Sequence, residues 1–175
     1  MAIDTIAQRL FELDMFHGLA PGQVESIARE AERIIFRDGQ VIAQAGAEAD
    51  GAFVLIAGRA TAVGDPERPV HIDGIEAGSM IGEAAMLTEH EFGLTVVADG
   101  DVRAIKITRE MLRQRMLDDA ALVEHFVGRV AARLTRVALE LRLIDERLAV
   151  ASEGRGAVVP GPGSTGFAAQ EMAPA

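Results

Sequence analysis

The sequence predicts a mainly β fold with flanking helices, in which an antiparallel roll or sandwich is preceded by short helices and followed by a long one. Three observations support this prediction: amphipathic segments at the N-terminus, a run of short β-prone segments, and a long proline-free stretch with helical periodicity. The chain has 175 residues, of which 49% are hydrophobic and 25% charged. This length and composition are typical of one globular domain.

The N-terminal segment predicts two helices. Apolar residues recur at helical spacing within residues 2–13, at Ile3, Ile6, Leu10 and Leu13. Gly18 interrupts this pattern, and Pro21 suits the first turn of a second helix that ends near Glu32. The acidic residues of the first segment are unlike a signal peptide, and no run of about 18 apolar residues predicts a membrane span. We therefore expect a cytoplasmic protein without a membrane segment.

Short β-prone segments follow, and Gly, Asp and Pro residues separate them. They are Arg33–Phe36, Val41–Gln44, Ala52–Ala57, Arg59–Val63, Val70–Ile75, Leu94–Ala98 and Asp101–Ile107. Many short strands without intervening helices predict an antiparallel sandwich or roll. The dipeptide Asp99-Gly100 between two apolar runs predicts a two-residue hairpin turn.

Helical periodicity returns after Ile107, and Thr108 is the expected N-cap. No proline occurs over residues 111–150, which predicts one long helix. Hydrophobic residues repeat there with alternating steps of three and four, as in a heptad seam: Val127, Val130, Leu134, Val137, Leu141, Ile144 and Leu148. A helix packed along its own β-domain is the alternative, but the length of the seam favours helix–helix dimerisation.

Three segments are therefore expected along the chain. Residues 1–110 contain the helical start and the roll, residues 111–150 form a dimerisation helix, and residues 151–175 form a tail. The tail is rich in Gly, Pro, Ala and Ser without apolar periodicity, which predicts disorder.

The composition excludes several classes of site. No cysteine is present, which excludes disulfides, cysteine-ligated zinc and iron–sulfur clusters. The four histidines are scattered, and no Ser/His/Asp arrangement is visible, so we expect no metal, no catalytic residue and no enzymatic activity. The formal net charge of −10 repels a phosphate backbone, and we expect no direct binding of nucleic acid.

The stretch Gly78-x-x-x-Gly82-Glu83, followed by Ala84 and Ala85, carries the most informative pattern. It can form a tight turn into one helical turn, whose converging backbone N–H groups can hold a phosphate. Glu83 lies at the edge of this turn, where its carboxylate can accept hydrogen bonds from a sugar hydroxyl. Taken alone, the pattern also fits a plain turn.

Further motifs occur around this stretch in a fixed order: Phe36-x-Asp-Gly-x-x-Ile42, Gly46-Ala-Glu-Ala-Asp50, Phe53-Val-Leu-Ile-x-Gly58, Thr95-Val-Val-Ala98 and Glu110-Met-Leu112. Over about residues 10–150 this order resembles the cyclic-nucleotide-binding domain, the sensor half of the catabolite-activator family of regulators. The resemblance implies an eight-stranded β-roll, closed by a long C-terminal helix that often dimerises. It also implies cyclic AMP or cyclic GMP as candidate ligands.

The sequence departs from this family at the phosphate. In ligand-binding members an arginine after the helical turn pairs with the cyclic phosphate, and that position falls on Phe92, with Gly93 next to it. No Arg or Lys occurs between Arg68 and Arg103. Because hydrogen bonds to charged groups contribute roughly 1.5–3 kcal/mol, this loss predicts an affinity lower by about 10 to 100 times or more. The candidate ligand-binding residues are Gly82, Glu83, Ala84, Ala85, Phe92 and Gly93.

Two hypotheses stay open on the sequence. In the first, the chain is a cyclic-nucleotide sensor with an unusual pocket, in which Gly82, Ala84 and Ala85 supply N–H groups and Glu83 holds the ribose. In the second, it is a dimeric interaction or scaffold module that binds a protein partner or another small ligand, and Phe92 fills the phosphate site. Regulators of the family carry a helix-turn-helix domain after the long helix. The residues after Val150 are too few for one, so we expect any transcriptional role to be indirect.

Overall fold

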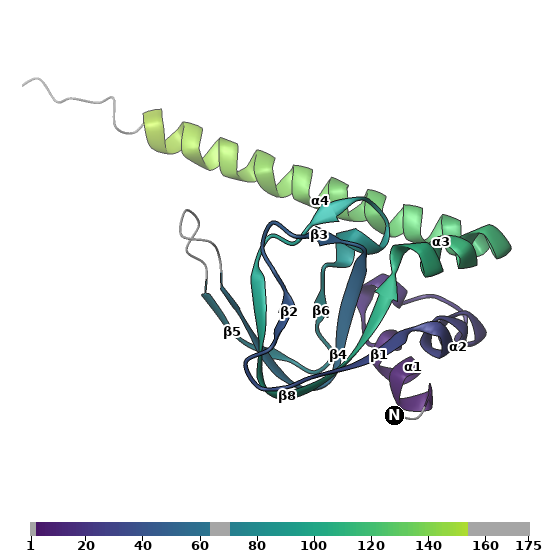
Figure 1. The fold of residues 1–175 in the computed structure, drawn as a ribbon. Helices are drawn as coiled ribbons and strands as arrows, with labels where there is room; N and C mark the ends of the chain where they lie inside the picture. Colours follow the sequence, from purple (N-terminus) through teal and green to yellow (C-terminus); the bar gives the residue numbers. More distant parts are fainter. Residues whose placement is uncertain (1–2, 64–70, 154–175) are drawn as a thin grey trace, which may run out of the picture. The chain divides into compact units, whose positions relative to one another are not determined.

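The computed structural model describes residues 3–63 and 71–153. Two compact units make up the chain, Met1–Ala131 and Ala132–Ala175. The first contains the N-terminal helices, the strands, α3 (Arg109–Asp118) and the first turns of α4 (Ala120–Glu153), and the second contains the rest of α4 (Figure 1). The expected disordered tail lies outside the described residues, apart from its first three residues, which end α4.

The two predicted N-terminal helices are confirmed as α1 (Ile3–Phe11) and α2 (Pro21–Glu30), with the short 3₁₀ helix η1 (Asp14–Phe16) between them. Pro21 lies in the first turn of α2, where its missing N–H costs no helical hydrogen bond. The side chain of Gln23 accepts a hydrogen bond from the Ala20 N–H at 2.9 Å. This contact satisfies one of the donors at the start of the helix.

Eight strands form within the described residues. They are β1 (Glu32–Phe36), β2 (Val41–Ala43), β3 (Glu48–Ala49), β4 (Gly51–Val63), β5 (His71–Glu76), β6 (Met80–Ile81), β7 (His90–Glu91) and β8 (Thr95–Thr108). One sheet has the order β1-β8-β4-β5, with β2 also paired to β8 and β6 to β4, and a second sheet joins β3 to β7. Every pairing is antiparallel, as the sequence predicts for a roll (Figure 1).

The predicted hairpin at Asp99-Gly100 is wrong, because both residues lie inside β8. The strand stays paired with β4 on both sides of this dipeptide, and the register shifts near Gly58. Gly58 and Gly100 have positive φ angles of 94° and 81°, so these glycines accommodate an irregularity in a long strand instead of a chain reversal. The Gly100 N–H donates to the Asp38 carboxylate at 2.8 Å, which fixes this bend.

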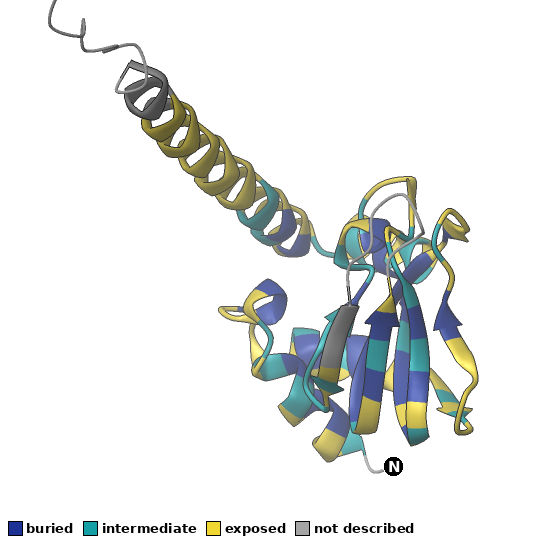
Figure 2. Ribbon diagram, turned by 90° about the vertical axis from the view of Figure 1, so that its left-hand side faces the viewer, coloured by how far each residue is buried: buried dark blue, intermediate teal, exposed yellow. Residues whose placement is uncertain are grey.

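Alternate residues of β4 enter two different cores. Ala52, Val54 and Ile56 pack with the helices in what we call the helix-side core. Phe53 and Leu55 point to the interior of the roll, the roll core. Because both faces are covered, all residues from 51 to 56 are buried, and buried residues concentrate in the strands and the adjoining helices (Figure 2).

The single helix expected over 111–150 is instead two helices, α3 and α4, separated by Asp119. The backbone of Asp119 is extended, with φ −139° and ψ 102°. One carboxylate oxygen of Asp119 accepts the Ala121 N–H at 3.0 Å, and the other accepts the Gln23 side-chain amide at 2.7 Å. Asp119 therefore starts a new helix by capping it. Thr108 is confirmed as the N-cap of α3, since its hydroxyl accepts the Met111 N–H at 3.2 Å.

The first turns of α4 pack against the helix-side core through Leu122 and Phe126, which are 2% and 1% exposed. The Phe126 ring meets Phe16 edge-on, with 5.9 Å between the ring centroids. No helix in the described ranges is both long and apolar enough to cross a bilayer.

Candidate functional site

The turn expected at Gly82 is present. Gly82 has a left-handed conformation, with φ 75° and ψ 33°, and precedes the 3₁₀ helix η2 (Glu83–Met86). The Ala85 N–H donates to the Gly82 carbonyl at 2.9 Å. The sequence predicts that this N–H would hold a phosphate. In the structure it already donates its hydrogen bond within the turn.

The ring of Phe92 lies directly against Gly82. A Cβ atom built on Gly82 would come within 2.6 Å of Phe92 Cε1, so any larger residue there would have to displace the ring, and the positive φ of Gly82 also favours glycine. Phe92 also stacks on Phe53 with 6.3 Å between centroids, and Phe53 meets Phe36 edge-on at 5.8 Å. Stacked and edge-to-face geometries are favourable for aromatic pairs. The residue at the expected arginine position is therefore part of an aromatic cluster beside the roll core.

The backbone holds Phe92 in this place. Its N–H donates to the Ala47 carbonyl at 3.0 Å, and its carbonyl accepts the Gly46 N–H at 2.8 Å. The flanking pair β3–β7 places Glu48 opposite Glu91 and Ala49 opposite His90. These contacts tie the segment after η2 to the segment before β4.

An open hollow of about 750 Å³ lies over this region, lined by Glu48, Glu89, His90, Glu91, Phe92 and Gly93. Three of these residues are acidic, and no Arg or Lys is among the described residues that line it. Like charges repel at short range, so the hollow disfavours an anionic ligand such as a cyclic phosphate.

Lys106 is a cation near the aromatic cluster that the sequence reasoning missed. Its Nζ lies 5.7 Å from the centroid of the Phe53 ring and 2.8 Å from an Asp50 carboxylate oxygen. The Lys106 side chain is only 18% exposed. Lys106 belongs to β8, where it lies opposite Phe53 of β4. The short distance between the two side chains therefore follows from the strand register and cannot be inferred from the sequence alone.

The ion pair with Lys106 makes the fold sensitive to acid at Asp50. The hydrogen bond from Lys106 lowers the pKa of Asp50 below its ordinary value of 3.8. A carboxyl group with a lower pKa in the folded state contributes stability above its unfolded pKa, and this contribution is lost as the pH falls through the folded value. Because Asp50 is 65% exposed, we expect the contribution to stay below about 1 kcal/mol.

Asp50→Asn is therefore expected to lower the free energy of unfolding slightly at pH 7, and the difference from the wild type is expected to shrink as the pH falls below about 4. Urea unfolding at pH 7 and pH 3 measures it, with Lys106→Met and the double variant completing a mutant cycle. An Asp50–Lys106 coupling of equal size at both pH values would contradict this assignment.

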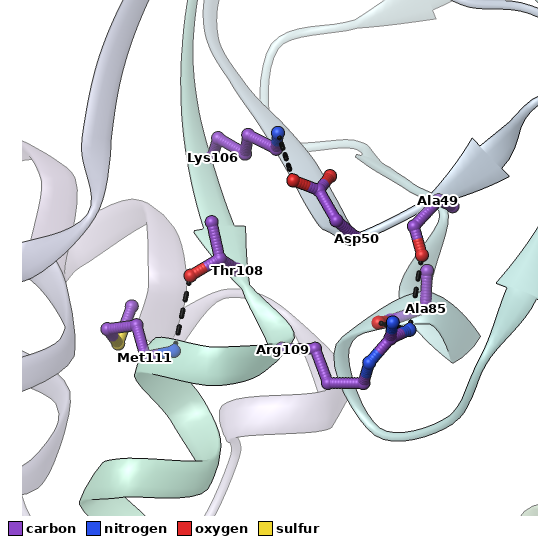
Figure 3. A network of polar contacts seen from close by, with 7 residues as sticks. All are labelled: Ala49, Asp50, Ala85, Lys106, Thr108, Arg109 and Met111. Carbon is purple, nitrogen blue, oxygen red and sulfur yellow. Dashed lines mark hydrogen bonds and ion pairs between the residues drawn. The ribbon is translucent and has the colours of Figure 1, made fainter.

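Arg109, the first residue of α3, connects that helix to η2 (Figure 3). Its guanidinium donates to the carbonyls of Ala49 at 3.2 Å, Ala85 at 3.3 Å and Thr88 at 2.8 Å. Its backbone N–H donates to the Asp50 carbonyl at 2.7 Å. One side chain therefore joins β3, the end of η2 and the start of α3.

The roll, the Gly82 turn and the helices that follow can be compared with known proteins. Residues 33–119 match the family model of the cyclic nucleotide-binding domain. The chain carries a cyclic nucleotide-binding domain. This confirms the family that the order of sequence motifs resembles.

Individual relatives agree with this result. The cyclic AMP receptor protein of Thermus thermophilus is 29% identical over 136 residues, which cover 75% of this chain, and the chain spans 62% of that relative's length. The solved structure of a cyclic nucleotide-binding-like protein from Brucella abortus has 27% identity and a TM-score of 0.58, covering 63% of this chain and 97% of that one. The N-terminal domain of a transcriptional regulator from Streptomyces coelicolor has a TM-score of 0.68 at 16% identity, over 77% and 92% of the two chains. This last likeness shows the fold alone.

In this cyclic nucleotide-binding domain, the structure brings together the residues that the sequence selects for the pocket. Gly82, Glu83, Ala84 and Ala85 form the turn and the start of η2, and Phe92 lies against that turn. Gly93 is exposed beside Phe92 and lines the hollow. Ala85 is buried, whereas Ala84 is exposed.

The predicted seam runs along α4, after the cyclic nucleotide-binding domain. Its exposed members include Val127 at 62%, Leu134 at 65%, Leu141 at 57% and Leu148 at 62%. In the first turns of α4 the residues that pack on the helix-side core are Leu122 and Phe126, so the helix contacts its own domain through a different face. Val123, which is 39% exposed, continues the heptad spacing toward the N-terminus and extends the predicted seam by one position.

Proposed function

We propose that this chain is a non-enzymatic, dimeric regulatory module, in which the cyclic nucleotide-binding domain does not hold a cyclic phosphate through an arginine pair. The contact between Phe92 and Gly82 is the observation that carries this proposal. The ring belongs to the residue at the expected arginine position and lies against the Gly82 turn. The hollow beside it is lined by three glutamates, which add negative charge.

Two costs oppose nucleotide binding at this turn. The missing charge-assisted pair removes roughly 1.5–3 kcal/mol. A nucleotide that reaches Gly82 also displaces the Phe92 ring from Phe53, and such aromatic pairs contribute about 0.5–1.5 kcal/mol beyond burial. Together these losses of about 2–4.5 kcal/mol weaken binding by about 1.5 to 3 orders of magnitude relative to a domain with the arginine.

The regulatory output in this proposal is the pairing of α4. Arg109 links the end of η2 to the start of α3 through the Ala85 and Thr88 carbonyls. A partner that binds at the hollow and moves η2 therefore acts on α3 and, through Asp119, on the start of α4. Such coupling of two sites through one element is the minimum for allosteric control.

A cyclic AMP or cyclic GMP sensor with an unusual pocket is the second candidate. The left-handed Gly82 and the start of η2 at Glu83 favour it, because these groups are the ones that a ribose and a phosphate would contact. In this candidate the Phe92 ring moves aside, and backbone N–H groups replace the arginine.

Isothermal titration calorimetry with cyclic AMP and cyclic GMP tests the proposal on the wild type, Phe92→Arg and Phe92→Leu. We expect no measurable heat from the wild type or Phe92→Leu, and affinity higher by about 10 to 100 times or more in Phe92→Arg. Phe92→Leu is the control for loss of the aromatic stack without a gain of charge. Far-UV circular dichroism checks that each variant is folded.

Micromolar binding by the wild type would contradict the proposal and select the sensor. Binding gained by Phe92→Arg alone would show a turn that still accepts a phosphate when a cation is restored. The search for the natural effector would then turn to protein partners.

A further inference from the structure

We propose that the outer face of β1 and β8 is a docking surface for an acidic segment of a partner protein. Three exposed residues form this surface, which we call the β1–β8 patch: Arg33, Ile35 and Arg103. The proposal is independent of the pocket at Gly82 and of the pairing of α4, because none of the three residues belongs to either.

The strand period places Arg33 and Ile35 on the outer face of β1. Ile34 and Phe36 pack against the roll core, and successive residues of a strand point to opposite faces. Arg33 and Ile35 therefore point away from the interior of the roll. Ile35 is 59% exposed, more than any other large hydrophobic residue in the described strands.

The register brings Arg103 of β8 next to Ile35. The two residues are directly opposite each other in the antiparallel pair β1–β8. Val102 and Ala104 belong to the roll core, so Arg103 points to the same outer face as Ile35. Residues directly opposite in such a pair have Cβ atoms about 4.5–5.5 Å apart. Ile35 therefore has Arg103 across from it and Arg33 two residues before it.

The N-terminal helices cover only part of this face. Ile105 is the next outward residue of β8 after Arg103, and it is fully buried in the helix-side core. Arg103 itself is exposed, as are Arg33 and Ile35 on the neighbouring strand. On β8 the helical cover therefore ends before Arg103, and the β1–β8 patch is open to solvent.

Unpaired charge distinguishes this patch from an ordinary exposed isoleucine, since single exposed apolar residues are common on protein surfaces. The described strands contain four Arg and Lys residues: Arg33, Arg59, Arg103 and Lys106. Arg59 and Lys106 form ion pairs with carboxylates. The side chains of Arg33 and Arg103 have no polar partner among the described residues. Both unpaired cations of the strands therefore flank the same exposed apolar side chain.

An ion pair limits the patch at one end. Arg37, two residues after Ile35, lies 2.7 Å from a carboxylate oxygen of Asp101, two residues before Arg103. The two charges of this pair cancel. The patch therefore keeps the positive charges of Arg33 and Arg103, although the formal net charge of the chain is −10.

This combination selects a short acidic segment that carries an apolar side chain. Arginine binds a carboxylate through two parallel hydrogen bonds and is enriched in protein interfaces. Ile35 offers an apolar surface that a phosphate backbone does not match, and two arginines are too few to hold a polyanion against the net charge of the chain. The partner segment therefore has carboxylates on both sides of one apolar residue. A contact of this size predicts a weak, transient complex.

NMR titration of the ¹⁵N-labelled full chain tests the patch with a defined probe. The probe is a capped nine-residue peptide of Gly and Ser, with a central leucine and a glutamate two positions to each side of it. We expect the backbone amides of Arg33, Ile35 and Arg103 to shift most, with a Kd of about 0.1–1 mM. Control peptides with glutamine for both glutamates, or serine for the leucine, should bind about 5 to 10 times more weakly.

Variants of the chain test the charged and the apolar part of the patch separately. Arg103→Glu turns one attraction into a repulsion, and we expect the Kd to rise about tenfold. Ile35→Ser removes the apolar contact, and we expect a rise of about fivefold. Arg136→Glu is the matched control, because it makes the same charge change at an exposed residue of α4, and it should leave the Kd unchanged. The double variant Arg33→Glu/Arg103→Glu should instead bind at the patch a peptide with lysines in place of the glutamates. Far-UV circular dichroism checks that each variant is folded.

Several outcomes would overturn the proposal. The absence of shifts in the wild type, shifts located away from β1 and β8, or equal binding of the glutamine peptide would each show that the patch does not select an acidic segment. Larger shifts at the patch from a single-stranded oligonucleotide or from phosphatidylserine vesicles would assign it to phosphate groups. A lower mass of Arg103→Glu by light scattering would assign it to contact with a second copy of the chain.

Discussion

Gly51→Ala is expected to lower the melting temperature by about 6–12 °C, which corresponds to a loss of about 3 kcal/mol for a chain of this size. Gly51 is the first residue of β4, and its backbone is packed against the end of β8. A Cβ atom there would lie 2.3 Å from the Ile107 carbonyl oxygen and 2.7 Å from the Thr108 Cα. Both are backbone atoms of a paired strand, so relief requires the β4–β8 ladder to separate next to the Thr108 cap.

Gly128→Ala is the matched control, because the same atom is added where nothing lies within 4 Å of it. Gly128 is in α4, where alanine is the better helix former by about 0.8–1 kcal/mol. We expect this variant to melt at or above the wild-type temperature. Thermal unfolding followed by circular dichroism at one fixed protein concentration measures both variants. Equal melting temperatures for Gly51→Ala and the wild type would contradict the packing described at this strand end.

The parts of the fold that rest on periodicity could be predicted from the sequence. The N-terminal helices follow from apolar spacing, and the alternation of Phe53 and Val54 between two cores follows from the strand period. The helix N-cap at Thr108 depends only on its hydroxyl accepting the Met111 N–H, three residues further along the chain. In these places local chemistry and tertiary structure agree.

The errors arose where a tertiary partner changed the meaning of a local pattern. Asp99-Gly100 has the residues of a hairpin turn, but β4 continues alongside β8, and Asp38 accepts the Gly100 N–H. Asp119 has no helix-breaking residue beside it, yet Gln23 from α2 and the Ala121 N–H both use its carboxylate. Asp38 lies 62 residues from Gly100, and Gln23 lies 96 residues from Asp119, so neither is visible in a sequence window around the residue that it contacts.

The candidate pocket shows the same division. The alignment of motifs places Phe92 at the arginine position, and the structure places its ring on Gly82, 10 residues earlier in the chain. Lys106 could not be predicted as part of this region, because it lies far from Phe53 in the sequence. Only the register of β8 against β4 places the two side chains next to each other. Residue types in the pocket were therefore predictable, and the cation beside the aromatic cluster was not.

The double variant Leu134→Asp/Leu141→Asp is expected to be a monomer at concentrations where the wild type is a dimer. These leucines are 65% and 57% exposed along α4, and in the proposed dimer they lie within the seam. Each dimer would then contain four carboxylates in an apolar seam, and an uncompensated buried charge costs several kcal/mol. We expect the dissociation constant to rise by about a thousandfold or more.

Leu139→Asp is the control that makes this result specific. Leu139 is 55% exposed on the same helix but lies on the face away from the seam, so the variant adds a similar charge without entering the dimer. Light scattering should give a dimeric mass for Leu139→Asp and a monomeric mass for the double variant, with the same helix content by circular dichroism. A dimeric double variant would move the interface off the heptad seam. Dissociation by Leu139→Asp instead would place the interface on the opposite face of α4.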